Sequence, residues 1–338
     1  MIIILYFLLL LGLGVYSYSQ IDLNLTLLQM PWFLGFQQIM IQLGYFNRPL
    51  STAIFLIITL LLFVFYILFL KNPPKKYIFL IGGIVLLGLF SYPAFSHDLF
   101  NSMFYPRIIF EHNANPYQVT ALMYPEDLWT RFMHWTHNTY QWGPVYLILT
   151  VPFYLLGLGK FVLTLFWFKL MSVLIYLGCS YFVYRLAKTR GLVLFAFNPL
   201  IIIEGIITGH LDLVMLFFAL MAIYFLSKEE NIKSYIFLLL SIGIKFATVL
   251  FLPVFVFWKR ISEKQRMIAL ISLAYFGAMI QLYFRDLLPH YFIVPLGVAA
   301  LYPKNRFNVG LLLLLSFVLL LIRYLPFLYS GQWPNIKF

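Results

Sequence analysis

The chain alternates between long apolar runs and short polar segments, and most of the apolar runs are about as long as a membrane-spanning helix. A helix of roughly 20 apolar residues crosses the hydrocarbon core of a bilayer. Lipid offers no hydrogen bonds to an exposed backbone, so spanning segments are helices or closed barrels. The runs lie at 1–19, 52–70, 77–95, 161–184, 192–207, 213–226, 267–283, 292–302 and 308–322. We therefore predict an all-α polytopic membrane protein, a bundle of about 9–11 membrane helices.

Most Lys and Arg residues lie in five of the short polar segments. Cytoplasmic loops of membrane proteins are enriched in these residues, so we place all five segments on the cytoplasmic side. The polar and aromatic stretch 96–144 then lies outside, together with the turns at 208–212 and 283–291. The five basic segments are KNPPKK (71–76), RLAKTRG (185–191), SKEENIK (227–233), WKRISEKQR (258–266) and PKNR (303–306).

Two apolar segments do not fit this topology as complete spans. Segment 145–157 is short and contains Pro152, and a full crossing there would carry the basic segment 185–191 to the outside. We predict that it forms a re-entrant or surface helix on the outer side. Residues 234–257 lie between two basic segments but are too few for two spans. They are predicted to form a broken or re-entrant pair that turns near Lys245, lined by protein.

Composition supports a membrane location and argues against a nucleic-acid partner. The chain is 63% hydrophobic and 10% charged, which leaves too little polar surface for a soluble domain. Its formal charge of +12 comes mostly from loops between spans, so we expect the bilayer and not nucleic acid as its partner. The first apolar run lacks a basic front end and is predicted to be a retained span. Cys179 is the single cysteine, which excludes an internal disulfide.

Ionisable side chains gather at the predicted outer face. Such groups at membrane depth are costly and tend to face a cavity or one another. Asp98 and Asp212 each stand where a span reaches this face, and neither has a Lys or Arg next to it. A carboxylate without a fixed partner is suited to act as a base, a metal ligand or a substrate clamp. The gathered residues are His97, Asp98, Glu204, His210, Asp212, Lys245, Arg285, Asp286, His290 and Arg323.

Structural roles are the alternatives for the same residues. Glu204 can pair with Lys169 inside the bundle, since both lie within apolar runs. Asp98 can cap the helix that follows it, and the Trp and Tyr residues near 140 are typical of a membrane-interface belt. The spacing of His210 and Asp212 is too sparse for zinc. A divalent cation, Mg²⁺ or Mn²⁺, that bridges carboxylates and a phosphate fits better, although its ligands stay unassigned.

Four segments in order resemble motifs of the GT-C superfamily, polytopic glycosyltransferases that use polyprenyl-phosphate sugars. The first, 96–117 (SHDLFNSMFYPRIIFEHNANPY), resembles the first outer loop, and 140–153 (YQWGPVYLILTVPF) is similar to the Tyr-x-Pro juxtamembrane element. Segment 196–215 (AFNPLIIIEGIITGHLDLVM) resembles the Asn-Pro, Glu and His-x-Asp pattern of prokaryotic mannosyltransferase-like members, which are akin to GPI mannosyltransferase I. Segment 283–296 (YFRDLLPHYFIVPL) is similar to their late Arg-Asp element.

This resemblance implies one transmembrane glycosyltransferase domain over 1–338, with 1–76 as extra N-terminal spans and 77–330 as a GT-C-like core. A large first outer loop would contain juxtamembrane helices. By position, Asp98 would be the catalytic base, Asp212 would be the second catalytic candidate, and Lys245 and Arg285 would bind the donor phosphate. The expected substrate-binding residues are His97, Tyr105, Arg107, Asn115, Tyr117, Tyr140, Glu204, His210, Lys245, Arg285, Asp286 and His290.

The expected function is transfer of a mannose-like hexose from a polyprenyl-phosphate donor to a hydroxyl of a lipid-linked or glycan acceptor. We expect inversion at the anomeric carbon and a site that faces outward from a prokaryotic cytoplasmic membrane. The rival interpretation is a transporter or flippase of lipid-linked sugars, in which broken helices also occur. Many transporters have two matched halves, whereas the large polar stretch 96–144 occurs once in this chain. A scaffold subunit is a third interpretation, but it would not require polar groups from several segments to converge.

Overall fold

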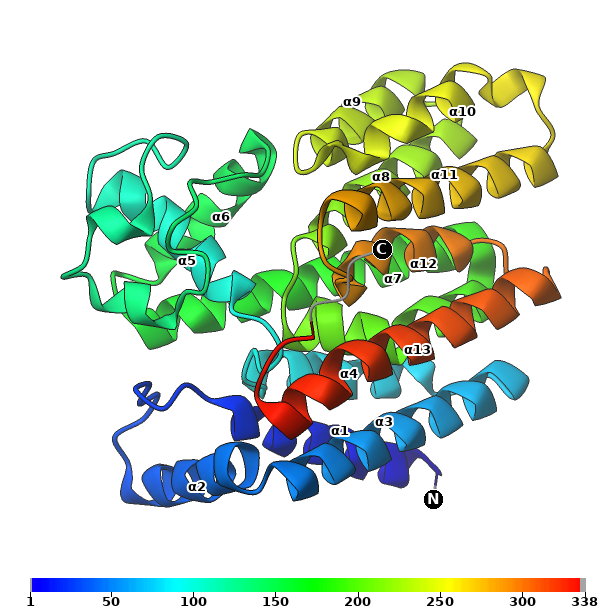
Figure 1. Cartoon of the computed structure of the whole chain (residues 1–338). Helices are drawn as coiled ribbons and strands as arrows, with labels where there is room; N and C mark the ends of the chain where they lie inside the picture. Colours follow the sequence, from blue (N-terminus) through cyan, green and yellow to red (C-terminus); the bar gives the residue numbers. More distant parts are fainter. Residues whose placement is uncertain (1, 335–338) are drawn as a thin grey trace.

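The computed structural model describes residues 2–334, and helices account for its regular structure (Figure 1). No strand occurs within this range. Five helical segments have the length and hydropathy of a membrane span, and a sixth is added if one bent pair is counted as one span. The prediction of an all-α polytopic membrane protein is confirmed. The five are Ile2–Gln20, which combines α1 (Ile2–Ser17) and the short helix Tyr18–Gln20, then α3 (Arg48–Lys71), α7 (Phe161–Ala196), α11 (Glu263–Phe284) and α13 (Arg306–Ser330).

Shorter helices complete the bundle and the lobe at its end. The apolar ones are α4 (Tyr77–Phe90), α6 (Pro144–Leu156), α9 (Asn231–Ile242), 246–256 with α10 (Leu252–Val256), and 289–299 with α12 (Ile293–Ala299). Helix α2 (Pro31–Ile41) follows the first span. Among the neighbouring pairs, α13 packs against α3, α1 against α4, and α8 (Asp212–Ser227) against both α7 and α9.

The predicted span 192–207 is the centre of the bundle. Every residue from 191 to 216 is buried, which explains why this stretch is apolar almost throughout and has no polar face. The second half of α7 forms the start of this segment. The connection predicted at 185–191 is a sharp turn and not an open loop, because only Lys188, with φ 56°, departs from helical geometry. The Tyr176 hydroxyl donates to the carbonyl of Ala196 at 2.8 Å. A straight helix would hold these residues about 30 Å apart, so the chain reverses at Lys188.

A sharp break in the chain separates this central segment from α8. The π-helix Ile201–Ile207 and α8 meet at an angle of 107°. Gly209 lies in the connection with φ +73°, a conformation that favours glycine. An added Cβ would also lie 3.1 Å from the side chains of Leu99 and Ser172. The break therefore depends on this glycine and fixes where the next residue, His210, is placed.

Lys169 of α7 stabilises the same break through hydrogen bonds from its side chain. Its ammonium group donates to the carbonyls of Ile206 and Ile207, each at 2.8 Å, and to the hydroxyl of Ser91 at 3.1 Å. These bonds satisfy carbonyls at the end of the π-helix, where no further turn continues it. The alternative of an ion pair between Lys169 and Glu204 is therefore wrong, since the lysine uses its three donors elsewhere.

The polar stretch between the second and third long spans forms a lobe at one end of the bundle (Figure 1). The lobe contains α5 (Asp98–Phe110), two short 3₁₀ helices (Ala121–Met123 and Leu128–Phe132) and α6. Helix α6 has 13 residues and is about 20 Å long, shorter than the roughly 30 Å of a bilayer core. Its length agrees with the prediction that it does not cross.

The predicted break near Lys245 contacts this lobe. Helix α9 ends at Ile242, and three residues separate it from a 3₁₀ helix (Phe246–Phe251). The amides of Gly143 and Val145 donate to the carbonyls of Ile244 and Gly243, at 2.9 and 3.1 Å. A Cβ on Gly143 would lie 2.0 Å from the Gly243 carbonyl oxygen, so only glycine permits this approach. The start of α6 and the break that carries Lys245 are thereby held together.

Candidate active site

A cavity of about 330 Å³ opens where the lobe meets the bundle. It lies at the N-terminal end of α8 and the C-terminal end of α11, and α5 and the lobe loops close its other side. Residues that are distant in sequence converge on it, as expected if the turns at 208–212 and 283–291 share one face with the polar stretch. The predicted site residues that line it are Asp98, Tyr105, His210, Asp212, Lys245, Arg285 and His290.

Asp98 presents its carboxylate to this cavity. One carboxylate oxygen accepts from the indole N–H of Trp135 at 3.0 Å, and the other lies 3.3 Å from Nδ1 of His210. The side chain is 22% exposed. The residue at the N-cap of α5 is His97, not Asp98, and no side chain caps the helix there. The capping alternative is therefore unsupported, and the side chain is held by contacts across the cavity instead.

The surroundings of Asp98 keep it ionised. Burial acts to raise the pKa of the Asp98 carboxyl, but the hydrogen bonds and positive charge supplied by His210 and the hydrogen bond from Trp135 outweigh it. The net effect is a pKa below the ordinary value of an aspartate. At neutral pH the group is a carboxylate, which can accept a proton.

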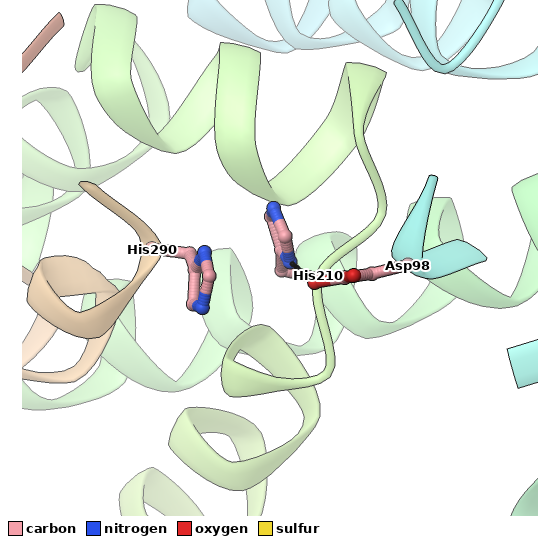
Figure 2. A group of neighbouring side chains, drawn as sticks. All are labelled: Asp98, His210 and His290. Carbon is pink, nitrogen blue, oxygen red and sulfur yellow. Dashed lines mark ion pairs between the residues drawn. The ribbon is translucent and has the colours of Figure 1, made fainter. Parts of the chain in front are cut away.

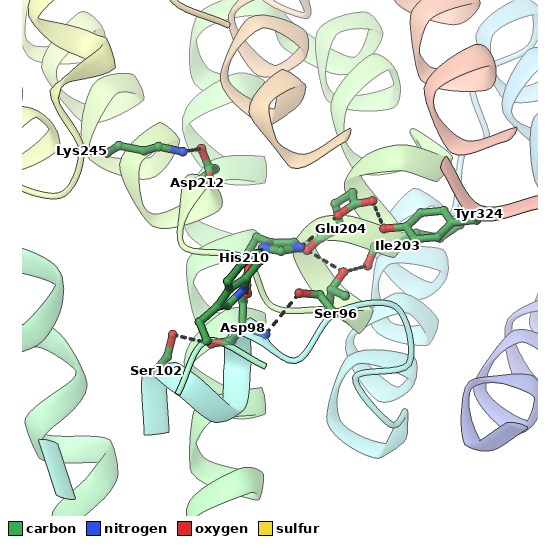
Figure 3. A network of polar contacts seen from close by, with 11 residues as sticks. Ser96, Asp98, Ser102, Ile203, Glu204, His210, Asp212, Lys245 and Tyr324 are labelled. Atoms are coloured by element: carbon green, nitrogen blue, oxygen red, sulfur yellow. Dashed lines mark hydrogen bonds and ion pairs between the residues drawn. The ribbon is translucent and has the colours of Figure 1, made fainter. Parts of the chain in front are cut away.

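Behind Asp98, a chain of polar contacts leads from the cavity into the core (Figure 3). Nε2 of His210 lies 3.2 Å from a carboxylate oxygen of Glu204. The other oxygen of Glu204 accepts a hydrogen bond from the hydroxyl of Tyr324. Both nitrogens of His210 thus face carboxylates, an arrangement that favours the imidazolium form, which donates from both. Glu204 is 0% exposed and lies beneath the cavity, where it contacts His210 and not the cavity itself.

Two cations stand near the other wall of the cavity. The Lys245 ammonium donates to Asp212 at 3.0 Å and lies 4.6 Å from the centre of the Tyr291 ring. The Arg285 guanidinium donates to the side-chain oxygen of Gln141 at 3.0 Å. The sequence suggested that Asp212 lacked a basic neighbour, and this is wrong, because a lysine 33 residues later reaches it.

Arg107 lies in the lobe and not on the cavity. Its Nε donates to Asp127 at 2.6 Å, and its guanidinium covers the ring of Trp129 at 4.5 Å. His112 donates to the same carboxylate oxygen at 3.0 Å. Burial acts to raise the pKa of Asp127, but the Arg107 hydrogen bond and charge lower it below the ordinary value. These contacts hold α5 against the loop that follows it.

Three other predicted residues form a layer behind the cavity wall. The Asn115 side chain accepts from the amide of Tyr117 at 3.0 Å, and the Tyr117 hydroxyl donates to the carbonyl of Trp142 at 3.2 Å. Tyr140 donates to the carbonyl of Gly143 at 2.9 Å. Its ring packs edge-on against Tyr105 at 4.9 Å. The layer therefore supports Tyr105 and Trp142, which do line the cavity.

His97 and Asp286 also lie outside the cavity lining. The His97 ring donates from Nδ1 to the carbonyl of Phe132 at 2.8 Å and stacks on His134 at 3.8 Å. Burial, followed by the proximity of His97, lowers the pKa of His134 to about 4. One carboxylate oxygen of Asp286 is buried, with no hydrogen-bond partner among residues 2–334. For these two residues, substrate binding stays a prediction.

Asp98, His210 and His290 are close enough to be considered as metal ligands (Figure 2). One possible ligand atom from each lies within 4.8 Å of the others. However, the His210 and His290 rings stack at 3.9 Å, and both nitrogens of His210 face carboxylates. One carboxylate and two imidazoles are also a poor match for Mg²⁺, which prefers oxygen ligands. A divalent cation therefore stays a prediction, and no step below depends on one.

Sequence reasoning missed three residues that the structure places at or behind the cavity. Trp135 lies in an aromatic run that was interpreted as an interface belt, yet it donates to Asp98. Tyr324 is within the last apolar span, and nothing near it in sequence marks it as the partner of Glu204. Asn101 could have been recognised from the sequence, since it is an amide on a helix whose neighbours Leu99, Phe100 and Met103 are apolar.

The fold and site define a class of protein: a polytopic membrane protein whose ionisable groups converge on a cavity at one end of the bundle. Comparison with family models identifies the chain more closely. The chain belongs to the family described as alpha-(1->6)-mannopyranosyltransferase, N-terminal domain, whose model matches residues 84–260, just over half of its length. It is thus a membrane glycosyltransferase of a mannosyltransferase family, as the GT-C resemblance predicted. No curated protein and no solved structure matched the chain.

Proposed function

We propose that this protein transfers a mannose residue from a polyprenyl-phosphate donor to a hydroxyl of a lipid-linked or glycan acceptor. The transfer takes place in the cavity bounded by Asp98 and Arg285, on the outer side of the membrane. The family supports the sugar. The basic segments at the opposite ends of α8 and α11 support the sidedness.

One observation carries the proposal: an ionised carboxylate and two cations are held around one cavity. Asp98 is oriented by Trp135 and His210, and Lys245 and Arg285 line the same space. Transfer from a sugar phosphate needs both kinds of group. A base must accept the proton of the attacking hydroxyl, and cations must stabilise the charge that gathers on the departing phosphate.

The chemistry is a displacement at the anomeric carbon. The acceptor oxygen forms a bond to this carbon while the bond from carbon to the phosphate oxygen breaks. The hydroxyl proton passes to the Asp98 carboxylate, and the polyprenyl phosphate leaves toward Arg285 and Lys245. His210 lies 3.3 Å from one oxygen of Asp98, and Trp135 donates to the other. These contacts hold the carboxylate at the cavity, where its remaining lone pairs can take the proton. A single displacement inverts the configuration of the sugar carbon.

A lipid-linked donor also accounts for the place of the site. The cavity lies at an end of membrane helices, where a prenyl chain in the bilayer and a polar acceptor can meet. The aromatic side chains Trp135, Trp142 and Tyr291 line it, and such amphipathic rings are typical of a membrane interface. A donor delivered by the membrane has no nucleotide to bind.

The test is transfer by the purified protein in lipid nanodiscs. We expect label from polyprenyl-phosphate mannose to reach a hydroxyl acceptor, and none to be transferred from a nucleotide-linked mannose. Asp98→Asn should lower turnover by roughly a hundredfold or more, the usual effect of removing a general base. The melting temperature should fall only modestly, since the amide oxygen still accepts from Trp135 while the charge that faces His210 is lost. Equal turnover by wild type and Asp98→Asn would exclude Asp98 as the base. Transport of the intact donor without transfer would instead support a flippase.

A further inference from the structure

Asn101 is a polar side chain buried in the cavity wall. It lies on α5, is 1% exposed, and lines the same cavity as Asp98. The two residues are three positions apart on one helix, so their side chains share a face. Asn101 therefore stands beside the carboxylate proposed as the base.

The amide of Asn101 is poorly satisfied by the protein. Neither its oxygen nor its nitrogen forms a hydrogen bond of ordinary length and angle with any residue in the described range 2–334, although the Tyr105 hydroxyl lies near it on the same helix. The next residue behaves differently, because Ser102 donates from its hydroxyl to the Asp98 carbonyl at 2.9 Å. Buried polar groups are nearly always hydrogen-bonded, and an unsatisfied one destabilises the fold. A leucine of similar size would avoid this cost, so the amide points to a ligand.

The chemistry of the amide and its neighbours identifies the class of ligand. An asparagine side chain both donates and accepts, and so does each hydroxyl of a sugar. Asn138 and Gln141 add further amides to the cavity, and the rings of Trp135 and Trp142 line it as well. Amide and aromatic groups fit the polar edges and apolar faces of a hexose, whereas the cations Lys245 and Arg285 fit a phosphate.

We propose that Asn101 binds hydroxyls of the transferred sugar and so determines which sugar is accepted. This inference rests on the proposed function. Held beside Asp98, the amide positions the ring so that its anomeric carbon faces the acceptor. A sugar that lacks the bound hydroxyl leaves the amide unpaired in the complex as well, and such sites discriminate strongly.

The test is a double-mutant cycle between the protein and the donor. Wild type and Asn101→Leu are assayed in nanodiscs with polyprenyl-phosphate mannose and with donors in which one sugar hydroxyl at a time is replaced by hydrogen. For the complete donor, kcat/KM should fall at least about a hundredfold in Asn101→Leu. With one or two of the deoxy donors, Asn101→Leu and wild type should have similar kcat/KM. The hydroxyl that Asn101 would bind is already missing from these donors, so removing the amide costs nothing further.

Stability separates ligand binding from a structural role. The melting temperature of Asn101→Leu without substrate should equal or exceed that of wild type, because an unpaired buried amide has been removed. Ser102→Ala is the matched control on the same helix and should keep the wild-type preference among donors. If Asn101→Leu does not fold, Asn101→Ala provides the same cycle.

The outcomes distinguish the two proposals. If wild type transfers from no lipid-linked sugar, the proposed function fails, and the sugar-binding role of Asn101 that rests on it is overturned with it. If wild type is active but the effects of Asn101→Leu and of every missing hydroxyl simply multiply, the proposed function stands and the sugar-binding role of Asn101 is overturned. A lower melting temperature with unchanged donor preference overturns it as well.

Discussion

Lys245 and Asp212 form an ion pair at the wall of the cavity, with the ammonium nitrogen 3.0 Å from a carboxylate oxygen. The Asp212 side chain is 2% exposed and that of Lys245 is 21% exposed. The lysine therefore has two tasks. It neutralises a carboxylate that is almost wholly buried, and it presents positive charge to the space proposed for the donor phosphate.

Substituting Lys245 should therefore affect stability as well as donor use. Lys245→Met leaves the Asp212 charge buried without a partner, which typically costs about 3–5 kcal/mol. We expect a lower melting temperature in detergent and weaker use of the lipid-phosphate donor. The double variant Lys245→Met with Asp212→Asn should recover most of the stability and little of the activity. Recovery of both together would show that the lysine has only a structural role and that Asp212 is dispensable for catalysis.

Arg285 offers the cleaner test of phosphate binding. Its guanidinium is exposed and donates to Gln141, and no carboxylate among residues 2–334 lies within hydrogen-bond distance of it. Arg285→Gln should raise the KM for the donor by about tenfold, the scale of one charge-assisted hydrogen bond. The melting temperature should not change. Gln141→Ala is the control, because it removes the hydrogen bond that positions the Arg285 side chain and keeps the positive charge. An unchanged donor KM in Arg285→Gln would remove this residue from the phosphate site.

The sequence predicted the convergence at the cavity because convergence follows from topology. Once the basic segments are placed on one side, the turns that carry His210, Lys245 and Arg285 must all reach the other side, near Asp98. No contact between side chains is needed for that conclusion. The break near Lys245 could be predicted for a similar reason, since residues 234–257 are too few for two spans.

The partners of these residues could not be predicted in the same way. Trp135 and Asp98 are 37 residues apart, and Tyr324 and Glu204 are 120 apart. Such pairs depend on how helices and loops pack, which hydropathy does not encode. The reversal at 185–191 was predicted from its basic residues, but its form was not, because a single residue with positive φ, Lys188, takes the place of an open loop.

The ion pair between Arg107 and Asp127 should stabilise the lobe more than it affects binding. Asp127→Asn removes a charge that accepts from Arg107 and His112, and hydrogen bonds to charged groups are worth about 1.5–3 kcal/mol. The variant should be cleaved faster by protease in the loop 112–140 and should keep a near-normal donor KM. Because the pKa of Asp127 is lowered in the fold, its contribution is present at neutral pH and is lost as pH falls through that pKa. A large rise in KM with unchanged protease resistance would instead place Arg107 at the substrate.

The topology prediction is tested by labelling single cysteines. In a Cys179→Ser background, cysteines at positions 126 and 160 should both react with a membrane-impermeant reagent from the outer side, because α6 between them is too short to cross. Both positions are exposed, so burial does not limit the reaction. A cysteine at position 264, in a basic segment, should react only after the membrane is opened. If position 160 reacts only from the cytoplasmic side, α6 crosses and this topology is wrong.

The interaction between His210 and Asp98 should be visible in the pH dependence of transfer. The Asp98 carboxylate is the active form, and it is present above its pKa and lost as pH falls through it. Donation from His210 lowers that pKa. His210→Gln removes the positive charge next to Asp98 but leaves Asp98 buried. The pKa of the Asp98 carboxyl should therefore rise in the variant. The acid limb of kcat/KM should therefore move to higher pH in the variant.

Two controls separate this effect from a general loss of structure. Trp135→Phe removes one neutral donor to the same carboxylate and should move the acid limb in the same direction by a smaller amount. Tyr324→Phe removes a donor to Glu204, one step further from the cavity, and should leave the limb nearly in place. Melting temperatures measured at each pH exclude unfolding as the cause. An acid limb that stays fixed in His210→Gln, with activity retained, would show that the titrating base is not the carboxylate that His210 contacts.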